Sequence, residues 1–484
     1  MARNGRRSGF RLGFWLAAGF LVAASPAYAG DVSVKLDVGA GFAVKNNTGS
    51  TDRFRVDEAT GNVSRNGALL VHTTGAHNMF MGPNTGNPAT TGFGYNTGFG
   101  SSALAAVTSG AFNSAFGFAA LNSNTTGFSN SAFGQSALQL NTTGGSNAAF
   151  GSQALITNST GSSNTALGRG ALFSNTSGSN NSAAGYGALH SNTTGGSNSA
   201  FGFIALNYNT TGYWNSAFGD GALRGDSTGP QNSAFGKSAL YATTTGGSNS
   251  AFGSYALRAN TTGFENAALG QTALRNNTSG ADNTAVGRFA LYGNTTGSRN
   301  IAIGSSAGSA QNTGNDNIYL ANAGVAAESN TIRIGTSGTH TATFIAGING
   351  TTVSGTGVLV TGSGQLGVLA SSARFKEAVE DMGEASDRLM ALRPVRFRYT
   401  RDAGGDGQTE EYGLIAEEVA EVAPELVIAD AEGRPFSVKY HELPSLLLNE
   451  VKKQRRTIEA QQQEIAALTT RLAGIEARTS DATH

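Results

Sequence analysis

The stretch NSAFGSYALRANTTGFE, residues 249–265, is one unit of a repeat that determines the fold. Each unit reads Asn-Ser-Ala-Phe-Gly, two variable residues, Ala-Leu, two variable residues and Asn-Thr-Thr-Gly. The first Asn recurs every seventeen residues, as Asn96, Asn113, Asn130, Asn147, Asn164, Asn181, Asn198, Asn215, Asn232, Asn249, Asn266, Asn283, Asn300 and Asn317, with an imperfect earlier copy at Asn78. A fixed period of this kind indicates a repeat architecture.

The length of the repeat indicates which repeat architecture the chain adopts. Seventeen residues are too few for two helices and a turn, and the content of Gly and β-branched residues argues against helix. The length suits one coil of a parallel β-solenoid or β-roll, in which each coil pairs with the next through main-chain hydrogen bonds. Fourteen coils at a strand spacing of ~4.8 Å would build a rod of roughly 65–70 Å. The fold class is therefore mainly β, with the rod expected over residues 78–320.

Two columns of apolar side chains are expected inside the rod. The first contains Phe116, Phe133, Phe150, Phe201, Phe218, Phe235 and Phe252. The second contains Leu121, Leu138, Leu155 and Leu172. The Asn-Thr-Thr-Gly segment supplies a turn in which Gly takes a positive φ and the Asn side chain bonds to the local backbone.

Each coil offers only one or two large apolar residues, so three chains are expected to share one core. The Ala-Phe-Gly and Ala-Leu repeats resemble the head repeats of trimeric autotransporter adhesins, which form trimeric β-rolls. The repeats of that family are shorter than seventeen residues. A monomeric solenoid stays open as the alternative.

The composition supports an ordered repeat. The chain has 484 residues with 68 Gly and only 13% charged residues, but its 26 Phe recur regularly, unlike in a disordered chain. The net charge is zero, which gives no reason to expect nucleic acid as a partner. There are no cysteines, so disulfides and thiolate metal sites are excluded.

The N-terminal sequence predicts export. Residues 1–29 contain Arg3, Arg6, Arg7 and Arg11, an apolar run, and the small-residue pattern Ala27-Tyr28-Ala29. This arrangement is typical of a signal peptide cut after Ala29. An uncleaved anchor helix is the alternative, but the run is short for a membrane span. We therefore expect a secreted or cell-surface protein without a transmembrane anchor.

The repeats offer little chemistry, and neither a cofactor nor a metal is predicted. The acids between residues 78 and 320 are Asp220, Asp226, Glu265, Asp282 and Asp316. Asp220 and Asp226 occupy different repeat positions, whereas a glycosidase needs two carboxylates facing one cleft. Residues 362–367 match a dinucleotide-binding fingerprint in letters alone; no helix follows, so a hairpin turn is expected.

Short β segments flank the rod. Residues 30–77 include FRVDEATGNVSRNGALLV, two alternating apolar runs that predict a β-hairpin. Residues 321–370 alternate similarly and form a β connector.

From residue 371 the sequence becomes charged and of ordinary globular composition. RPVRFRYT predicts a strand, and EYGLIAEEVAEVAPELV predicts a strand followed by a short helix that ends at Pro424. SSARFK, YGLIAEEVAEVAPELV and SVKYHELPSLLLNEV, in that order before a heptad segment, resemble the C-terminal intramolecular chaperone auto-processing domain. That family is the endosialidase-type serine peptidase found at the ends of phage tailspikes and fibres. The resemblance implies a small α+β chaperone domain over residues 371–446.

The resemblance also implies a catalytic dyad of Ser371 and Lys376, with cleavage between Ala370 and Ser371. A serine hydroxyl is a weak nucleophile until a base takes its proton, and a lysine is that base only if burial lowers its pKa. Ser372 stands where the family has Asp or Asn. The alternative is that Ser371 belongs to a linker and Lys376 is a surface charge. His441 is interpreted as structural.

Residues 447–478 predict a coiled coil of about four heptads. The a positions hold Val451, Ile458, Ile465 and Leu472, and the d positions Leu447, Leu468 and Ile475, interrupted by Gln454 and Gln461. A single amphipathic surface helix is the alternative.

The leading hypothesis is an exported homotrimeric fibre, interpreted as an adhesin, whose tail directs trimerisation and then cuts itself off. Its other expected partner is a glycan or a host-surface ligand. One alternative is a tailspike-like glycan-degrading enzyme carrying the same chaperone. Another is a purely structural surface component.

Overall fold

A computed structural model describes residues 41–45, 52–66, 68–346, 348, 354–403, 406–430 and 432–481. The signal peptide predicted for residues 1–29 lies outside these residues. The chain divides into two units, Met1–Ile345 and Ala346–His484.

The first unit begins with antiparallel strands. They are β1 (Phe42–Lys45), β2 (Asp52–Val56), β3 (Val63–Arg65) and β4 (Ala68–His72), each paired with the next. The turn after β2 is closed by the carboxylate of Asp57, which accepts a hydrogen bond from the Thr60 N–H at 3.1 Å. The hairpin predicted within residues 30–77 is confirmed.

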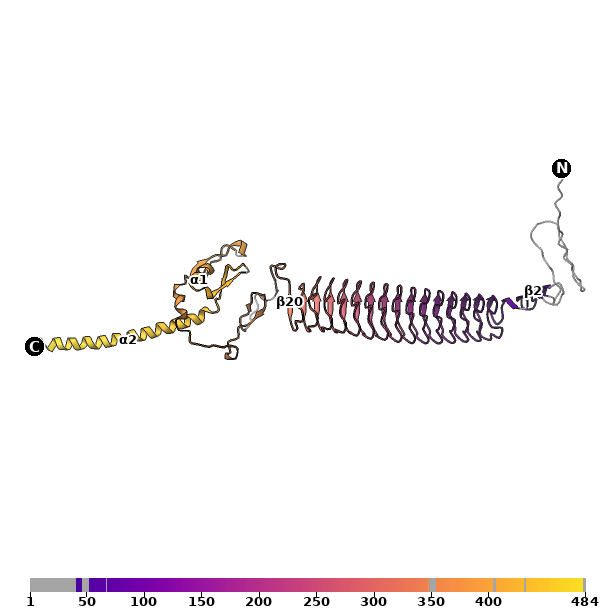
Figure 1. Cartoon of the computed structure of the whole chain (residues 1–484), viewed down its shortest axis with the longest axis horizontal. Coiled ribbons are helices and arrows are strands. Elements are labelled where there is room, and N and C mark those ends of the chain that lie inside the picture. Colours follow the sequence, from indigo (N-terminus) through magenta and orange to yellow (C-terminus); the bar gives the residue numbers. More distant parts are fainter. Residues whose placement is uncertain are drawn as a thin grey trace, which may run out of the picture. The chain divides into compact units, whose positions relative to one another are not determined.

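A parallel ladder of three-residue strands follows, about fifteen turns long (Figure 1). Its strands are β5 (Met79–Met81), β6 (Thr97–Phe99), β7 (Ser114–Phe116), β8 (Ser131–Phe133), β9 (Ala148–Phe150), β10 (Thr165–Leu167), β11 (Ser182–Ala184), β12 (Ser199–Phe201), β13 (Ser216–Phe218), β14 (Ser233–Phe235), β15 (Ser250–Phe252), β16 (Ala267–Leu269), β17 (Thr284–Val286), β18 (Ile301–Ile303), β19 (Ile318–Leu320) and β20 (Ile332–Ile334). Ser114 pairs with Ser131, and this seventeen-residue register continues along the repeats. The predicted parallel solenoid is confirmed.

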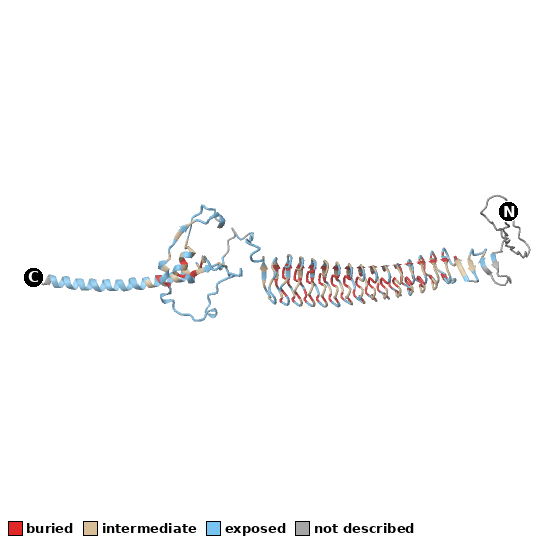
Figure 2. Ribbon diagram, turned by 45° about the horizontal axis from the view of Figure 1, so that its top comes forward, coloured by how far each residue is buried: buried red, intermediate tan, exposed pale blue. Residues whose placement is uncertain are grey.

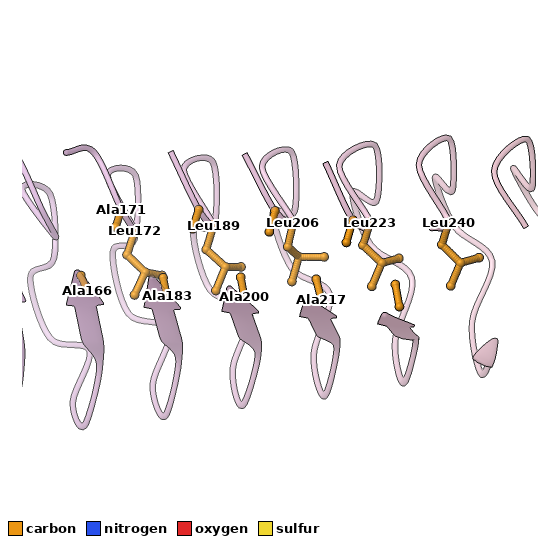
Figure 3. Packing of buried hydrophobic residues seen from close by; sticks show 14 of the residues in the cluster. Ala166, Ala171, Leu172, Ala183, Leu189, Ala200, Leu206, Ala217, Leu223 and Leu240 are labelled. Carbon is orange, nitrogen blue, oxygen red and sulfur yellow. The ribbon is translucent and has the colours of Figure 1, made fainter. Parts of the chain in front are cut away.

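The interior of the solenoid consists of Leu and Ala columns. We number repeat positions from the first Asn, so that Asn113 is position 1. The Ala at positions 3 and 8 and the Leu at position 9 are almost completely buried throughout the ladder, as Ala217, Ala222 and Leu223 illustrate. Figure 2 shows this buried line along the rod, and Figure 3 shows the Leu side chains facing the Ala of the strands. The predicted Leu column is confirmed.

The prediction that the Phe column lies inside is wrong. Phe133, Phe150 and Phe252 are 36%, 40% and 41% exposed, whereas the Ala that precedes each of them is fully buried. Successive rings stack on the outer face, with centroids 4.8 Å apart for Phe218 and Phe235. Side chains alternate across a strand, so burying the Ala at position 3 turns position 4 outward.

A single chain closes this core, so the expectation of a core shared by three chains is corrected. The physical reason is residue size: two sides of the coil lined by Ala approach closely enough for one Leu to fill the remaining space. Such a coil does not need a large side chain from a neighbouring chain.

Two columns of buried Asn side chains fix the register of the coils. At position 1, the Asn113 Oδ1 accepts hydrogen bonds from the backbone N–H of Asn130 at 3.0 Å and from its Nδ2 at 3.1 Å. At position 12, the Asn141 Nδ2 donates to Asn124 Oδ1 at 2.7 Å. Both columns also donate to the carbonyl of the position 15 glycine. A buried amide without these partners would be costly, so each coil must align with its neighbours.

Two features shape the turns of each coil: a close contact at the position 15 glycine and the burial of the Leu at position 9. The position 15 glycine does not take the expected positive φ; it is required because a Cβ at Gly127 would lie 2.2 Å from Asn124 Oδ1. Positive φ values fall elsewhere in the coil, among them at the position 5 glycine, with Gly117 at 137°, and at the buried Leu at position 9, with Leu121 at 52°. L-residues other than Gly, Asn and Asp rarely adopt this conformation, and here burial of the Leu side chain stabilises it.

Large aromatic residues close both ends of the Ala column. Phe80 occupies position 3 of the first ladder strand, β5, and Tyr319 occupies position 3 of β19, which one further strand, β20, follows; both side chains are fully buried. Gly86 and Gly308 make room for them, since a Cβ at either residue would lie within 2.7 Å of the ring. These rings cover core surface that the terminal coils would otherwise expose.

The second unit contains short elements and one long helix. Its strands form three antiparallel pairs: β21 (Leu359–Val360) with β22 (Leu366–Gly367), β23 (Val395–Phe397) with β24 (Glu411–Gly413), and β25 (Val427–Ala429) with β26 (Pro435–Val438). Its helices are η1 (Ala373–Phe375), η2 (Gly383–Ala391), η3 (Arg401–Ala403), α1 (Ala416–Val422), η4 (Pro424–Leu426) and α2 (Leu443–Asp481). The hairpin turn expected at residues 362–367 and the strand–helix–Pro424 sequence are confirmed.

Substitutions can test which columns are inside. We expect Ala217→Leu to destabilise the rod by about 1–3 kcal/mol through overpacking, and Leu223→Ala by about 2–5 kcal/mol through a cavity. Thr211→Leu adds the same side chain at an exposed position and should change stability by no more than about 0.5 kcal/mol. Urea unfolding checks these values. Equal tolerance of Ala217→Leu and Thr211→Leu would place the Ala column outside.

A buried acid interrupts the position 12 column and makes stability depend on pH. Burial raises the pKa of Asp226 to about 8 from an ordinary 3.8, although Gly229 and Asn232 donate hydrogen bonds to it. Its neighbour in the column, Asn209, has a buried Oδ1 without a hydrogen-bond partner among the described residues. Between these pKa values the folded state holds a proton that the unfolded state has lost. The free energy of unfolding should therefore fall as pH rises from about 4 to about 8.

The Asp226→Asn variant should remove this pH-dependent part of the free energy of unfolding, because an amide carries no charge. Its amide also supplies the hydrogen-bond donor that Asn209 Oδ1 lacks. We expect the variant to exceed the wild type in stability by a few kcal/mol at pH 9 and to approach it at pH 4. Unfolding midpoints measured across this range check the difference. Parallel pH profiles for the two proteins would contradict the assignment.

Candidate functional site

The quoted tail motifs fold around one small apolar core. Val419, Ala423, Leu426 and Val438 are buried together, and Leu414 and Leu443 pack against them. The Tyr440 hydroxyl accepts a hydrogen bond from the Leu414 N–H at 3.0 Å, which joins the YHE and YGL segments. Arg393 forms an ion pair with Glu418 in α1. Residues that are distant in sequence thus assemble one domain body.

Ser371 and Lys376 flank the short helix η1. The turn is held by backbone bonds from Phe375 N to Ser372 O at 3.0 Å and from Lys376 N to Ala373 O at 3.1 Å. Both dyad side chains are exposed, and within the described ranges no hydrogen bond joins them. The dyad therefore stays a prediction.

The surroundings of η1 are apolar as well as exposed. Phe375 is 63% and Val379 75% exposed. The Arg374 guanidinium lies 4.7 Å from the centre of the Phe375 ring. Large apolar side chains at this exposure are surfaces that association would cover.

A second serine–lysine contact lies at the start of α2 and was missed from the sequence. Ser386 in η2 is 1% exposed, and its hydroxyl donates a hydrogen bond to Glu450. The same hydroxyl accepts hydrogen bonds from Asn449 Nδ2 at 2.6 Å and from Lys453 Nζ at 3.2 Å. Lys453 also contacts Asp387. The sequence offered no distinct signal, because these residues lie in a charged stretch with polar side chains at many positions.

Electrostatics argue against catalysis by this second contact. Hydrogen bonds to Asp387 and Glu450 raise the pKa of Lys453 above its usual value. Hydrogen bonds from Lys453 and Ser386 lower the pKa of Glu450. Lys453 is therefore held in its protonated form and cannot take a proton from Ser386. The network instead anchors α2 to η2.

The other residue singled out in this region from the sequence is His441. It lies just before α2 with its Nε2 3.7 Å from Glu442 Oε1. In the described part of the chain, no hydrogen bond or ion pair joins it to Ser371, and its structural role stays a prediction.

The long helix α2 includes residues 447–478, for which a coiled coil was predicted. Its a and d side chains stay half exposed: Leu447, Val451, Ile458, Ile465, Leu468, Leu472 and Ile475 range from 50% to 62%. Figure 2 shows this part of the helix as exposed. The helix is confirmed, while its pairing with other copies remains a prediction. An open, mainly apolar groove of about 570 Å³ lies beside its first turns, lined by Leu389, Leu392, Leu443 and Leu447 among others.

Comparison with known proteins identifies the tail. Residues 371–428 match the family model of the peptidase S74 family, described as the chaperone of endosialidase. The match begins at Ser371, the predicted first residue of the tail domain. No curated protein and no solved structure matches the chain. Within the described ranges, no helix is long and apolar enough to cross a membrane, and no cluster of His, Cys, Asp or Glu could hold a metal ion.

Proposed function

We propose that the chain is an exported, homotrimeric fibre protein whose tail templates assembly and then separates from the rod by cutting between Ala370 and Ser371. The observation that carries this proposal is the order of parts: a chaperone-of-endosialidase match follows a β-solenoid rod, after a short connector. A chaperone domain in this position fits a fibre-like protein that assembles as an oligomer.

Apolar surfaces support association between copies. The heptad side chains of α2 lie exposed along one helix, and coiled coils bury such side chains against partner helices. In the rod, position 4 forms a second outward apolar column, in which Leu167 and Ala184 separate two stacks of Phe rings. Homotrimer formation would cover the helix seam first, because the seam is local and does not depend on the rod being folded.

The proposed cut is an acyl transfer on the chain itself. Lys376 accepts the proton of the Ser371 hydroxyl while Oγ attacks the carbonyl carbon of Ala370. The peptide C–N bond then breaks, the proton passes to the departing amine of Ser371, and an ester joins Ala370 to Ser371 Oγ. Water hydrolyses this ester and frees both fragments. Burial of Lys376 by a neighbouring chain would lower its pKa and so couple cleavage to assembly.

Export and an adhesive role complete the proposal. Residues 1–29 support secretion or display at the cell surface, and a long surface with little charge suits binding more than turnover. The rival, a glycan-degrading rod, needs two carboxylates in one cleft. Asp226 is buried in the interior, and Asp316 is held in an ion pair with Arg299. These two acids are therefore poor candidates for that chemistry.

Deleting residues 371–484 should abolish correct assembly. Non-local β pairing is slow without a template and leaves sheet edges exposed during folding. We expect monomers or aggregates by size-exclusion chromatography with light scattering, whereas the uncut Ser371→Ala chain, which keeps its tail, should form trimers. Recovery of soluble trimers from the deletion would contradict the chaperone role.

Cleavage should depend on the predicted dyad alone. We expect Ser371→Ala and Lys376→Ala each to give an uncut trimer, since the first removes the nucleophile and the second the base. Ser372→Ala serves as the control and should still be processed. Denaturing gels, intact mass and N-terminal sequencing of the tail fragment check these outcomes. A fragment that begins at Ser372, or that appears in Ser371→Ala, would show that another group is the nucleophile.

A further inference from the structure

One column on the outside of the rod combines cations with aromatic rings. Position 10 of successive repeats carries Arg224, Tyr241, Arg258, Arg275 and Tyr292, which we call the Arg–Tyr column. Earlier coils have Asn122, Gln139 and Ile156 at the same position and keep the same backbone. The coil itself therefore does not require Arg or Tyr there.

Arg224 is held between two tyrosines. Its Nη1 donates to the Tyr241 hydroxyl at 2.6 Å and its Nη2 to the Tyr208 hydroxyl at 3.1 Å. Its guanidinium carbon lies 4.9 Å from the centre of the Tyr208 ring and 5.4 Å from that of Tyr241. A guanidinium has five N–H donors, so donors remain after these two bonds.

The next two arginines repeat the arrangement. Arg258 lies over Tyr241 and Tyr255, 5.5 and 5.8 Å from their ring centres. Arg275 donates to the Tyr292 hydroxyl at 3.0 Å. All three arginines are half buried, so their guanidinium groups are held in place before any ligand arrives.

These three charges lack acidic partners. Within the described ranges, no ion pair involves Arg224, Arg258 or Arg275. The acid nearest in sequence to Arg224 is Asp226, which points into the interior, where burial raises its pKa to about 8 and favours the neutral form. Unpaired, ordered cations are conspicuous in a rod with so little charge, and they favour an anionic ligand.

We propose that the Arg–Tyr column binds a linear anionic polysaccharide through its carboxylate or sulfate groups. Guanidinium groups bind such oxyanions by paired hydrogen bonds, and Tyr rings offer apolar faces to sugars. Neighbouring coils are ~4.8 Å apart, so the cations follow the axis of the rod as charges follow an extended polymer. Three cations on a chain of zero net charge are too few for strong nucleic-acid binding, which rests on many phosphate contacts.

This inference rests on the proposed fibre role and specifies its ligand. The test uses the full-length protein, as expressed, after its oligomeric state and processing have been recorded. Heparin serves as the sulfated probe, polygalacturonate as the carboxylated probe and dextran as the neutral one. We expect binding to at least one anionic probe, weakened by salt, and none to dextran.

A triple variant, Arg224→Gln, Arg258→Gln and Arg275→Gln, should raise the Kd at least about tenfold, a loss of about 1.4 kcal/mol. The matched control neutralises the three exposed cations at position 6: Arg169→Gln, Lys237→Gln and Arg288→Gln. It makes the same change in net charge and should leave the Kd within about twofold, because those side chains are exposed and lie outside the Arg–Tyr column, although Arg169 and Arg288 each lie over one ring. A single Arg258→Lys variant, which keeps the charge and loses the planar fork, should bind more weakly than the wild type even if the triple variant fails to fold.

Three results would overturn the inference: no binding to either anionic probe, equal loss in both triple variants, or equal binding of single-stranded DNA. If the sample is trimeric and processed but binds neither probe, the ligand assignment fails and the fibre assignment stands. If the chain neither assembles nor cuts itself, the fibre assignment fails whatever the probes show.

Discussion

The buried amide of one asparagine needs its partner in the neighbouring coil, and the rest of the rod follows from that requirement. Along the ladder, the Asn at position 1 accepts from the backbone N–H of the next such Asn and, in most coils, from its side chain, while its own amide reaches a glycine carbonyl. The backbone bond is kept even across the end coils of 18 and 14 residues. A coil that lost the pairing would leave these groups unpaired inside the protein, at a cost of about 1–3 kcal/mol each. The same constraint requires small residues at particular positions of the repeat. Glycine is needed where its carbonyl meets the two Asn amides, and Ala is needed where the coil is narrow.

Near-identical coils create a problem that the tail is suited to solve. A slip by one whole repeat replaces most side chains with equivalent ones, so the repeats alone discriminate weakly between registers. Within a chain, Phe80 and Tyr319 mark the two ends. Between chains, a template outside the rod would have to set the alignment. On the proposed role, the exposed heptad seam of α2 and the domain body anchored to it through Ser386 supply that template.

The sequence alone was sufficient for the repeat, the parallel ladder, the Leu column and the tail elements, because these depend on period and motif. It did not show which face of each strand points into the core. A three-residue Ser-Ala-Phe strand has one side chain pointing one way and two pointing the other, and residue size favours the wrong choice for Phe. The positive φ of Leu121 was likewise hidden, since local preference assigns that conformation to glycine. For Ser371 and Lys376, the family resemblance supplied the spacing, but no hydrogen bond joins them among the described residues, so their pairing stays a prediction.

The most direct test of a tail that assembles the rod and is then removed is the reversibility of unfolding. Wild-type trimers that have been cut and separated from their tails should not regain trimeric rods after dilution from denaturant, because the template is gone and the native state persists kinetically. Uncut Ser371→Ala trimers, treated identically, should recover. Equal recovery of the two proteins, measured by light scattering and protease resistance, would contradict the account.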